Sequence, residues 1–144
     1  MKEDNKIKLF LVDDDVVFLK SLEIEFLQHA DLFIETFTTG EDCVENLSHN
    51  PDVIILDYML NSIVEHAMNG IETLDKIKEY DPDIQVVILS AQDKIEVAVN
   101  CMRHNAYDYV VKSETAFMRL QKIISAIFNK RKTEKELRWY MERM

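Results

Sequence analysis

The sequence contains few of the residues that interrupt or cross-link a chain: 2 Gly, 2 Pro and 2 Cys in 144 residues. With 47% apolar residues, this composition excludes a disordered or low-complexity chain and favours one compact domain rich in helices and strands. The two cysteines, Cys43 and Cys101, lack the spacing of a metal site and are too few for a disulfide framework. We therefore expect buried, unreactive thiols in a reducing compartment.

Long apolar runs and an excess of positive charge are also missing. No run approaches the roughly 20 apolar residues that span a membrane, and the first six residues contain no apolar signal core. The formal net charge of −10 argues against binding to nucleic acids and to anionic membranes. The sequence thus predicts a cytoplasmic protein that contacts neither nucleic acid nor membrane.

Four short apolar runs, rich in Val and Ile, each end in a reactive polar side chain. Runs of this length and composition predict strands buried on both faces of a parallel sheet. Parallel strands present their C-terminal ends at one edge, where open α/β sheets place their chemistry. The runs with the side chains that follow them are 8–12 with Asp13, Asp14 and Asp15, 53–56 with Asp57, 86–89 with Ser90, and 109–111 with Lys112.

Segments with helical periodicity alternate with these strands, and residues 32–37 predict one more strand at the edge of the sheet. The alternation predicts the α/β class, with a doubly wound, five-stranded parallel sheet and helices on both faces. The predicted helices are 16–29, a shorter one after Gly40 that includes Cys43, Val44 and Leu47, 71–80, 94–103, and an extended last helix from 114 onward.

The polar residues at the strand ends suit phosphoryl transfer. Asp13, Asp14 and Asp57 would lie side by side if the first and third strands are neighbours. Carboxylates this close stay ionised only where a cation offsets their repulsion, and an all-oxygen site suits Mg²⁺. Asp57 can act as a nucleophile, while Lys112 and Ser90 can contact phosphoryl oxygens. At any single position a helix-capping turn is the simpler explanation, but the whole set predicts a phosphoryl-transfer site.

In this order, the motifs resemble the receiver domain of two-component response regulators over roughly residues 6–128. The segments that carry the resemblance are 11–15 (LVDDD), 51–57 (PDVIILD), 89–91 (LSA) and 106–112 (AYDYVVK). Each segment alone is weak, but the ordered set is highly specific. The resemblance implies a flavodoxin-like sheet with strand order 2-1-3-4-5, in a signalling domain that catalyses only its own phosphorylation and dephosphorylation.

The resemblance also implies a role for each site residue. Asp57 is then the phosphoacceptor, which receives its phosphoryl group from a sensor histidine kinase or a phosphotransfer protein. The implied Mg²⁺ ligands are Asp13, Asp14, Asp57 and the backbone carbonyl of Met59. The implied sensors of the phosphoryl group are Ser90 and Lys112, with Tyr109 as an aromatic side chain that swings inward as the serine moves.

Three positions depart from the family pattern. Ser113 replaces a Pro whose peptide bond is commonly cis, and a cis bond before a non-proline residue costs about 3 kcal/mol, which favours a trans peptide here. Asn61 replaces another expected Pro. The expected Gly comes late, at Gly70, so that the connection 58–69 is longer than usual. These changes affect the shape of the site and the lifetime of a phosphoryl group, and they remove no reactive side chain.

The sequence becomes basic after residue 128. Residues 129–144 contain six Lys or Arg against three Glu, so we divide the chain into a receiver domain, 1–128, and a charged helical extension or linker, 129–144. Two interpretations of this tail stay open: a solvated extension of the last helix, or a linker that dimerises or reaches an output domain. The tail contains one apolar stripe, and if something covers this stripe we expect a weak homodimer. The stripe is Leu137, Tyr140, Met141 and Met144.

Two other functions compete with the phosphorylation switch. Asp13 and Asp15 resemble the Asp-x-Asp motif of haloacid-dehalogenase-type phosphatases. That family needs a further strand ending in paired acids after Lys112, which the sequence lacks, and it leaves Asp57 without a role. A receiver-like domain that has lost phosphorylation is the other alternative, and the retained Asp57, Ser90 and Lys112 argue against it. We therefore predict a phosphorylation-controlled signalling switch.

Overall fold

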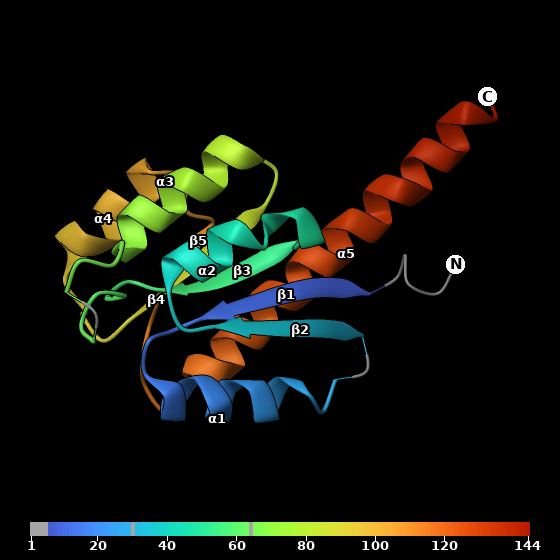
Figure 1. The fold of residues 1–144 in the computed structure, drawn as a ribbon. Helices are drawn as coiled ribbons and strands as arrows, with labels where there is room; N and C mark the ends of the chain where they lie inside the picture. Colours follow the sequence, from blue (N-terminus) through green and yellow to red (C-terminus); the bar gives the residue numbers. More distant parts are fainter. Residues whose placement is uncertain (1–5, 30, 64) are drawn as a thin grey trace.

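The computed structural model describes residues 6–29, 31–63 and 65–144, and it shows one parallel sheet between two layers of helices (Figure 1). The strand order is β2-β1-β3-β4-β5, which confirms the predicted α/β fold and its flavodoxin-like order. The strands are β1 (Ile7–Val12), β2 (Leu32–Phe37), β3 (Val53–Asp57), β4 (Gln85–Ser90) and β5 (Asp108–Val111). The helices are α1 (Val16–Phe26), α2 (Gly40–Glu45), the short 3-10 helix η2 (Leu47–His49), α3 (Gly70–Tyr80), α4 (Ile95–Arg103) and α5 (Ala116–Glu142).

Alternate side chains of the central strands enter two apolar clusters, one on each face of the sheet. In β1, Leu9 and Leu11 pack with α1 and α5, whereas Phe10 and Val12 pack with α2, α3 and α4. All of β3 is buried, as expected for a strand covered on both faces. Because helices cover both faces, a ligand can approach this sheet only at its strand ends.

Polar caps determine where two of the helices begin. The Asp15 carboxylate accepts hydrogen bonds from the backbone N–H groups of Val17 and Phe18, at 3.1 and 3.2 Å, and so begins α1. Asn69 and Glu72 form a reciprocal capping box at the start of α3. The first cap turns the chain back along the sheet within three residues of β1, and the second ends the long connection after β3.

Helices α3, α4 and α5 begin within two residues of their predicted starts, whereas α1 and α2 end earlier than predicted. The first ends at Phe26 instead of residue 29, because the chain leaves the helix in a tight turn: Leu27 is the C-cap, and the His29 N–H donates to the Phe26 carbonyl at 3.0 Å. Leu47 was predicted to belong to the helix that follows Gly40. It lies instead in the separate helix η2. It is still buried, so the periodicity identified its burial correctly although it misplaced its helix. The strand β2 lies at the edge of the sheet, as predicted.

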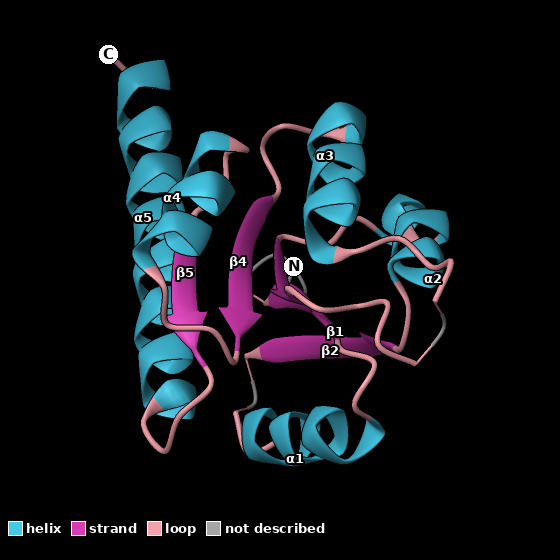
Figure 2. Cartoon of the chain, turned by 90° about the vertical axis from the view of Figure 1, so that its left-hand side faces the viewer, coloured by secondary structure: helices cyan, strands magenta, loops and turns pink. Residues whose placement is uncertain are grey.

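Helix α5 runs alongside β5 and continues well beyond it (Figure 2). Its last buried side chain is Ile127, and an ion pair of 2.6 Å between Arg131 and Asp52 follows one turn later. Residues 132–144 are all exposed. Because α5 crosses residue 128 without a break, the division of the chain into a receiver domain and an extension stays a prediction.

Two expectations from composition concern thiols and membrane spans. Cys43 and Cys101 are buried and free, as predicted. Burial raises the pKa of Cys43 to about 12 and that of Cys101 to about 11, so that both thiols stay protonated at neutral pH. In the part of the chain that the structure describes, no helix combines the length and the apolar character needed to cross a membrane.

Candidate functional site

The predicted reactive side chains lie at the C-terminal edge of the sheet. Strand β1 pairs in parallel with β3, β3 with β4, and β4 with β5. The C-terminal ends of these four strands therefore meet at one edge, and the polar residues that end or follow them share it. The residues at these strand ends are Asp13, Asp14, Asp57, Ser90 and Lys112.

Three carboxylates form a compact cluster. Asp13, Asp14 and Asp57 each place one carboxylate oxygen within 4.8 Å of the other two. The Asp13 carboxylate is 2% exposed; its Oδ1 accepts the backbone N–H of Asp15 at 2.9 Å, and its buried Oδ2 faces the Lys112 ammonium. Three close carboxylates that share a single ammonium form an oxygen-only ligand set with unbalanced negative charge, which fits a hard divalent cation such as Mg²⁺.

Lys112 is the positive charge at this cluster. Its Nζ lies 3.0 Å from Asp13 Oδ2 and 3.4 Å from Asp57 Oδ1, and 4.5 Å from the centre of the Phe18 ring. Burial by itself would lower the pKa of Lys112, but the hydrogen bond from the ammonium to Asp13 and the charge of Asp57 outweigh burial and raise it. The ammonium therefore stays charged, and it offsets part of the repulsion between the carboxylates.

The Asp57 carboxylate is buried beside another negative charge. Burial, and then the charge of Asp13, raise its pKa to about 7, against the lowering effects of Lys112 and of a hydrogen bond from the Met59 backbone. Since only the carboxylate is a nucleophile, the group needs additional positive charge to be fully ionised near neutral pH. A bound divalent cation would supply that charge.

The connection after β3 contacts the second carboxylate of the cluster. Asp14 Oδ2 accepts hydrogen bonds from the Ser62 backbone N–H at 3.1 Å, the Ser62 hydroxyl at 2.5 Å and the Ile63 backbone N–H at 3.3 Å. The unusual length of this connection is visible in the sequence, but its two contact residues were not predicted. Backbone donors have no sequence signal, and a serine in a loop is too common to attract attention.

Ser90 and Tyr109 are joined through one residue of the loop after β4. The buried Ser90 Oγ accepts the backbone N–H of Gln92 at 3.0 Å, and the Tyr109 hydroxyl donates to the Gln92 carbonyl at 2.5 Å. Tyr109 is partly buried against the cluster of α2, α3 and α4, and burial raises its pKa. The tyrosine thus already lies inward in this structure, and its predicted movement stays a prediction.

Two further features of the site concern the peptide after Lys112 and the backbone of Met59. The Lys112–Ser113 peptide is trans, like every other peptide bond among the described residues. The predicted metal ligand at Met59 is its backbone carbonyl. The structure assigns its backbone a hydrogen bond to Asp57 and leaves its side chain 45% exposed, so the role of the carbonyl as a ligand stays a prediction.

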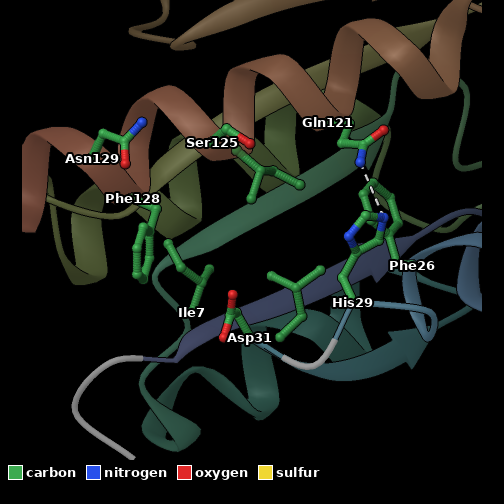
Figure 3. Close-up of a pocket in the computed structure, with 10 residues that line it drawn as sticks. Ile7, Phe26, His29, Asp31, Gln121, Ser125, Phe128 and Asn129 are labelled. Carbon is green, nitrogen blue, oxygen red and sulfur yellow. Dashed lines mark hydrogen bonds between the residues drawn. The ribbon is translucent and has the colours of Figure 1, made fainter.

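A separate cavity of about 180 Å³ lies at the opposite edge of the sheet, between α1, α5 and the first residues of β1 and β2 (Figure 3). Ile7 and Leu32, which begin those strands, line it, and Gln121 contacts the His29 ring at 3.1 Å across its end. The cavity is therefore distinct from the carboxylate cluster, and it contains none of the predicted site residues.

A sequence model of the response regulator receiver domain matches residues 9–125, which is most of the chain. The chain belongs to this family. Receiver domains are signalling domains of two-component systems, and the fold, the strand-end carboxylates and the lysine described above agree with that membership. The receiver-domain match does not favour the phosphatase alternative. In addition, the exposed Asp15 carboxylate caps α1 by accepting hydrogen bonds from the backbone N–H groups of Val17 and Phe18.

Similar proteins include regulators and isolated receiver domains. The regulatory protein LuxO of Vibrio cholerae serotype O1 is 33% identical over 100 residues, which are 69% of this chain and 21% of LuxO. The chain thus spans about a fifth of that relative. A structure of the NtrX receiver domain from Brucella abortus aligns with a TM-score of 0.71 and 25% identity, over 84% of this chain and 98% of that chain. A chain of the CheX–CheY–BeF₃–Mg²⁺ complex from Borrelia burgdorferi aligns with a TM-score of 0.72 and 26% identity, over 88% and 98%.

Proposed function

We propose that this receiver domain is a phosphorylation-controlled switch in a two-component phosphorelay, with Asp57 as its phosphoacceptor. The observation that carries the proposal is the position of Asp57: a buried carboxylate at the end of the central strand, with the Lys112 ammonium 3.4 Å from its Oδ1. The donor would be the phosphohistidine of a sensor histidine kinase or of a phosphotransfer protein. The chain itself would catalyse only its own phosphorylation and dephosphorylation.

The proposed chemistry is a displacement at phosphorus. A carboxylate oxygen of Asp57 forms the new P–O bond while the P–N bond of the donor breaks, and the electron pair of that bond returns to the imidazole. Lys112 lies where its ammonium can contact an oxygen of the transferred group, and this contact stabilises the negative charge of the acyl phosphate. The Ser90 hydroxyl can donate its proton to another oxygen, because Oγ acts as the acceptor in its hydrogen bond with the Gln92 N–H.

The proposed metal is Mg²⁺, held by Asp13, Asp14, Asp57 and the Met59 carbonyl. When bound, it supplies positive charge that keeps the carboxylates ionised and neutralises the incoming phosphoryl oxygens. The close carboxylate oxygens support this assignment, because among the described residues only the Lys112 ammonium lies within ion-pair distance to offset their charge. A similar chain from Borrelia burgdorferi belongs to a complex with BeF₃ and Mg²⁺, which also supports it.

The proposed switch is the chain of contacts from Ser90 to Tyr109. Both residues bond the backbone of Gln92, one through its N–H and the other through its carbonyl. A phosphoryl group that draws Ser90 Oγ toward it as the hydroxyl donates would displace the acceptor of the Gln92 N–H, and the loop, Tyr109 and the start of α4 would then adjust. Hydrogen exchange with and without beryllofluoride tests this: changes confined to α1 and β2 would contradict the switch.

The decisive test of the proposed function is the mass of the intact protein after incubation with acetyl phosphate. We expect one added phosphoryl group with Mg²⁺, none with EDTA, and none in Asp57→Ala. Asp31→Asn, at the opposite edge of the sheet, is the matched control and should behave as the wild type. A phosphoryl group on Asp57→Ala, or one that forms equally well in EDTA, would refute the assignment of Asp57 and of the metal.

We also propose that the exposed end of α5 supports a weak homodimer. Four apolar residues of this segment are more than half exposed, which favours covering them with a second copy. They are Leu137, Tyr140, Met141 and Met144. Sedimentation of the full chain and of a chain that ends at Asn129, each with and without beryllofluoride, tests the proposal. A dimer only in the full chain supports it, whereas monomers under all four conditions would leave the tail as a solvated extension.

A further inference from the structure

The connection between β3 and α3 is attached to the rest of the domain on both sides of its contact with Asp14. Before the contact, Leu60 is 1% exposed in the cluster of α2, α3 and α4. After it, the Met68 backbone N–H donates to Glu41 Oε2 at 2.8 Å, and the Gly70 N–H donates to the Tyr58 carbonyl at 3.0 Å. Ser62 is therefore presented to Asp14 by a segment with defined ends.

The contact itself is polar and does not depend on packing. The Ile63 side chain is 75% exposed, so apolar burial does not hold this residue in place. What holds it is the set of three donors from Ser62 and Ile63 that meet on the single oxygen Asp14 Oδ2. Three hydrogen bonds occupy the acceptor capacity of that oxygen. No described residue donates to Asp14 Oδ1, which leaves that oxygen available to a cation.

We propose that Ser62 and the Ile63 amide are positioning groups for the metal: they hold the Asp14 carboxylate so that Oδ1 is presented to Mg²⁺ before the ion arrives. The inference rests on the Mg²⁺ site of the proposed function and adds to it the role of the long connection. A free carboxylate side chain would lose rotational freedom on binding a cation, and the three donors remove that freedom in advance. Hydrogen bonds to metal-ligating carboxylates commonly contribute 10- to 100-fold, roughly, in metal affinity.

The same arrangement couples the connection to the metal in both directions. If the donors on Oδ2 strengthen Mg²⁺ binding at Oδ1, then bound Mg²⁺ strengthens those hydrogen bonds by the same factor. The metal-bound domain should therefore have a more rigid connection after β3. The alternative, in which Mg²⁺ competes with Ser62 for the same oxygen, predicts the opposite sign for both effects.

The test compares Mg²⁺ affinity by titration calorimetry of the full chain in the wild type, Ser62→Ala and Ser62→Thr. Ser62→Ala loses the hydroxyl donor, and we expect about a 10-fold weaker affinity. Ser62→Thr keeps the hydroxyl and should restore most of the affinity. Ser48→Ala, an exposed serine in η2, is the matched control and should leave it unchanged.

A second measurement separates positioning from simple loss of fold. Hydrogen exchange at the Ser62 and Ile63 amides should slow when Mg²⁺ is added to the wild type, and this protection should be smaller in Ser62→Ala. Equal affinity in Ser62→Ala and the wild type, or faster exchange with Mg²⁺, would overturn the inference while leaving the Mg²⁺ site intact. A wild type that binds no Mg²⁺ would instead refute the metal assignment of the proposed function.

Discussion

Lys112 Nζ lies 3.0 Å from Asp13 Oδ2, and the same ammonium is 3.4 Å from Asp57 Oδ1. Among the described residues, it is the one positive charge within ion-pair distance of the carboxylate cluster. The two buried carboxylates and the lysine are supplied by three different strand ends. The ammonium therefore has two roles: it stabilises the metal-free domain, and it lies beside the proposed phosphoacceptor.

Replacing the lysine should destabilise the domain in a way that metal can reverse. Lys112→Met leaves the buried carboxylates of Asp13 and Asp57 without their cation, and we expect a loss of about 2–4 kcal/mol in the free energy of unfolding with EDTA. Added Mg²⁺ should restore part of it, because the ion supplies the missing charge. Urea unfolding with EDTA and with Mg²⁺ measures both effects. Lys122→Met, at an exposed position of α5, is the control; an equal loss in both variants would contradict the prediction.

Neutralising Asp57 should stabilise the metal-free domain, and the gain should depend on pH. The folded-state pKa of Asp57, about 7, is higher than the value of 3.8 for an unperturbed carboxyl, so the folded state binds this proton more tightly than the unfolded state does. The contribution of Asp57 to the free energy of unfolding of the wild type is therefore greatest at low pH, and it is lost as the pH rises toward 7. Asn carries no charge at any pH.

Asp57→Asn should thus match the wild type below about pH 4 and exceed it by at most about 4 kcal/mol above about pH 8, with EDTA present throughout. Thermal unfolding across this pH range measures the difference. A gain that is constant with pH would mean that packing, and not the charge of Asp57, is its source. A variant less stable than the wild type at alkaline pH would contradict the raised pKa.

Gly70 should resist substitution because the chain passes so close to the end of β3. A Cβ atom at this position would lie 2.7 Å from the backbone carbonyl oxygens of both Asp57 and Tyr58. These atoms belong to the backbone, so Gly70→Ala has to shift the start of α3 or the end of β3. We expect a loss of about 1–3 kcal/mol in unfolding free energy and weaker Mg²⁺ binding. Unchanged values of both in urea unfolding and calorimetry would show that the connection adapts freely.

The two thiols should be unreactive in the folded protein. Cys43 and Cys101 are both 0% exposed, and burial raises the pKa of each thiol well above neutrality. A thiol-specific disulfide reagent at neutral pH should therefore titrate neither cysteine until the domain unfolds, and both in urea. Rapid reaction of one thiol in native buffer would indicate local opening, on the side of the sheet covered by α2 to α4.

The reactive side chains could be located from the sequence because their positions follow from a simple rule. An apolar run of Val, Ile and Leu predicts a buried strand, and the residue directly after a parallel strand reaches the open edge of the sheet. Asp13 and Lys112 directly follow β1 and β5, and Asp57 and Ser90 are the last residues of β3 and β4. Strand ends were therefore predicted to within a residue, while the helix boundaries at Phe26 and η2, which depend on local turns, were not.

What the sequence alone determined is the set of strands, the chemistry at their ends and the family, because these depend on local composition and on the order of motifs along the chain. Only the tertiary structure decided which groups form ion pairs and hydrogen bonds with each carboxylate. Lys112 reaches Asp13 and Asp57 from another strand, and Ser62 reaches Asp14 across 48 positions of sequence. Such contacts depend on the path of loops and on backbone donors. Every residue carries these donors, so their partners are set by where the folded chain places them.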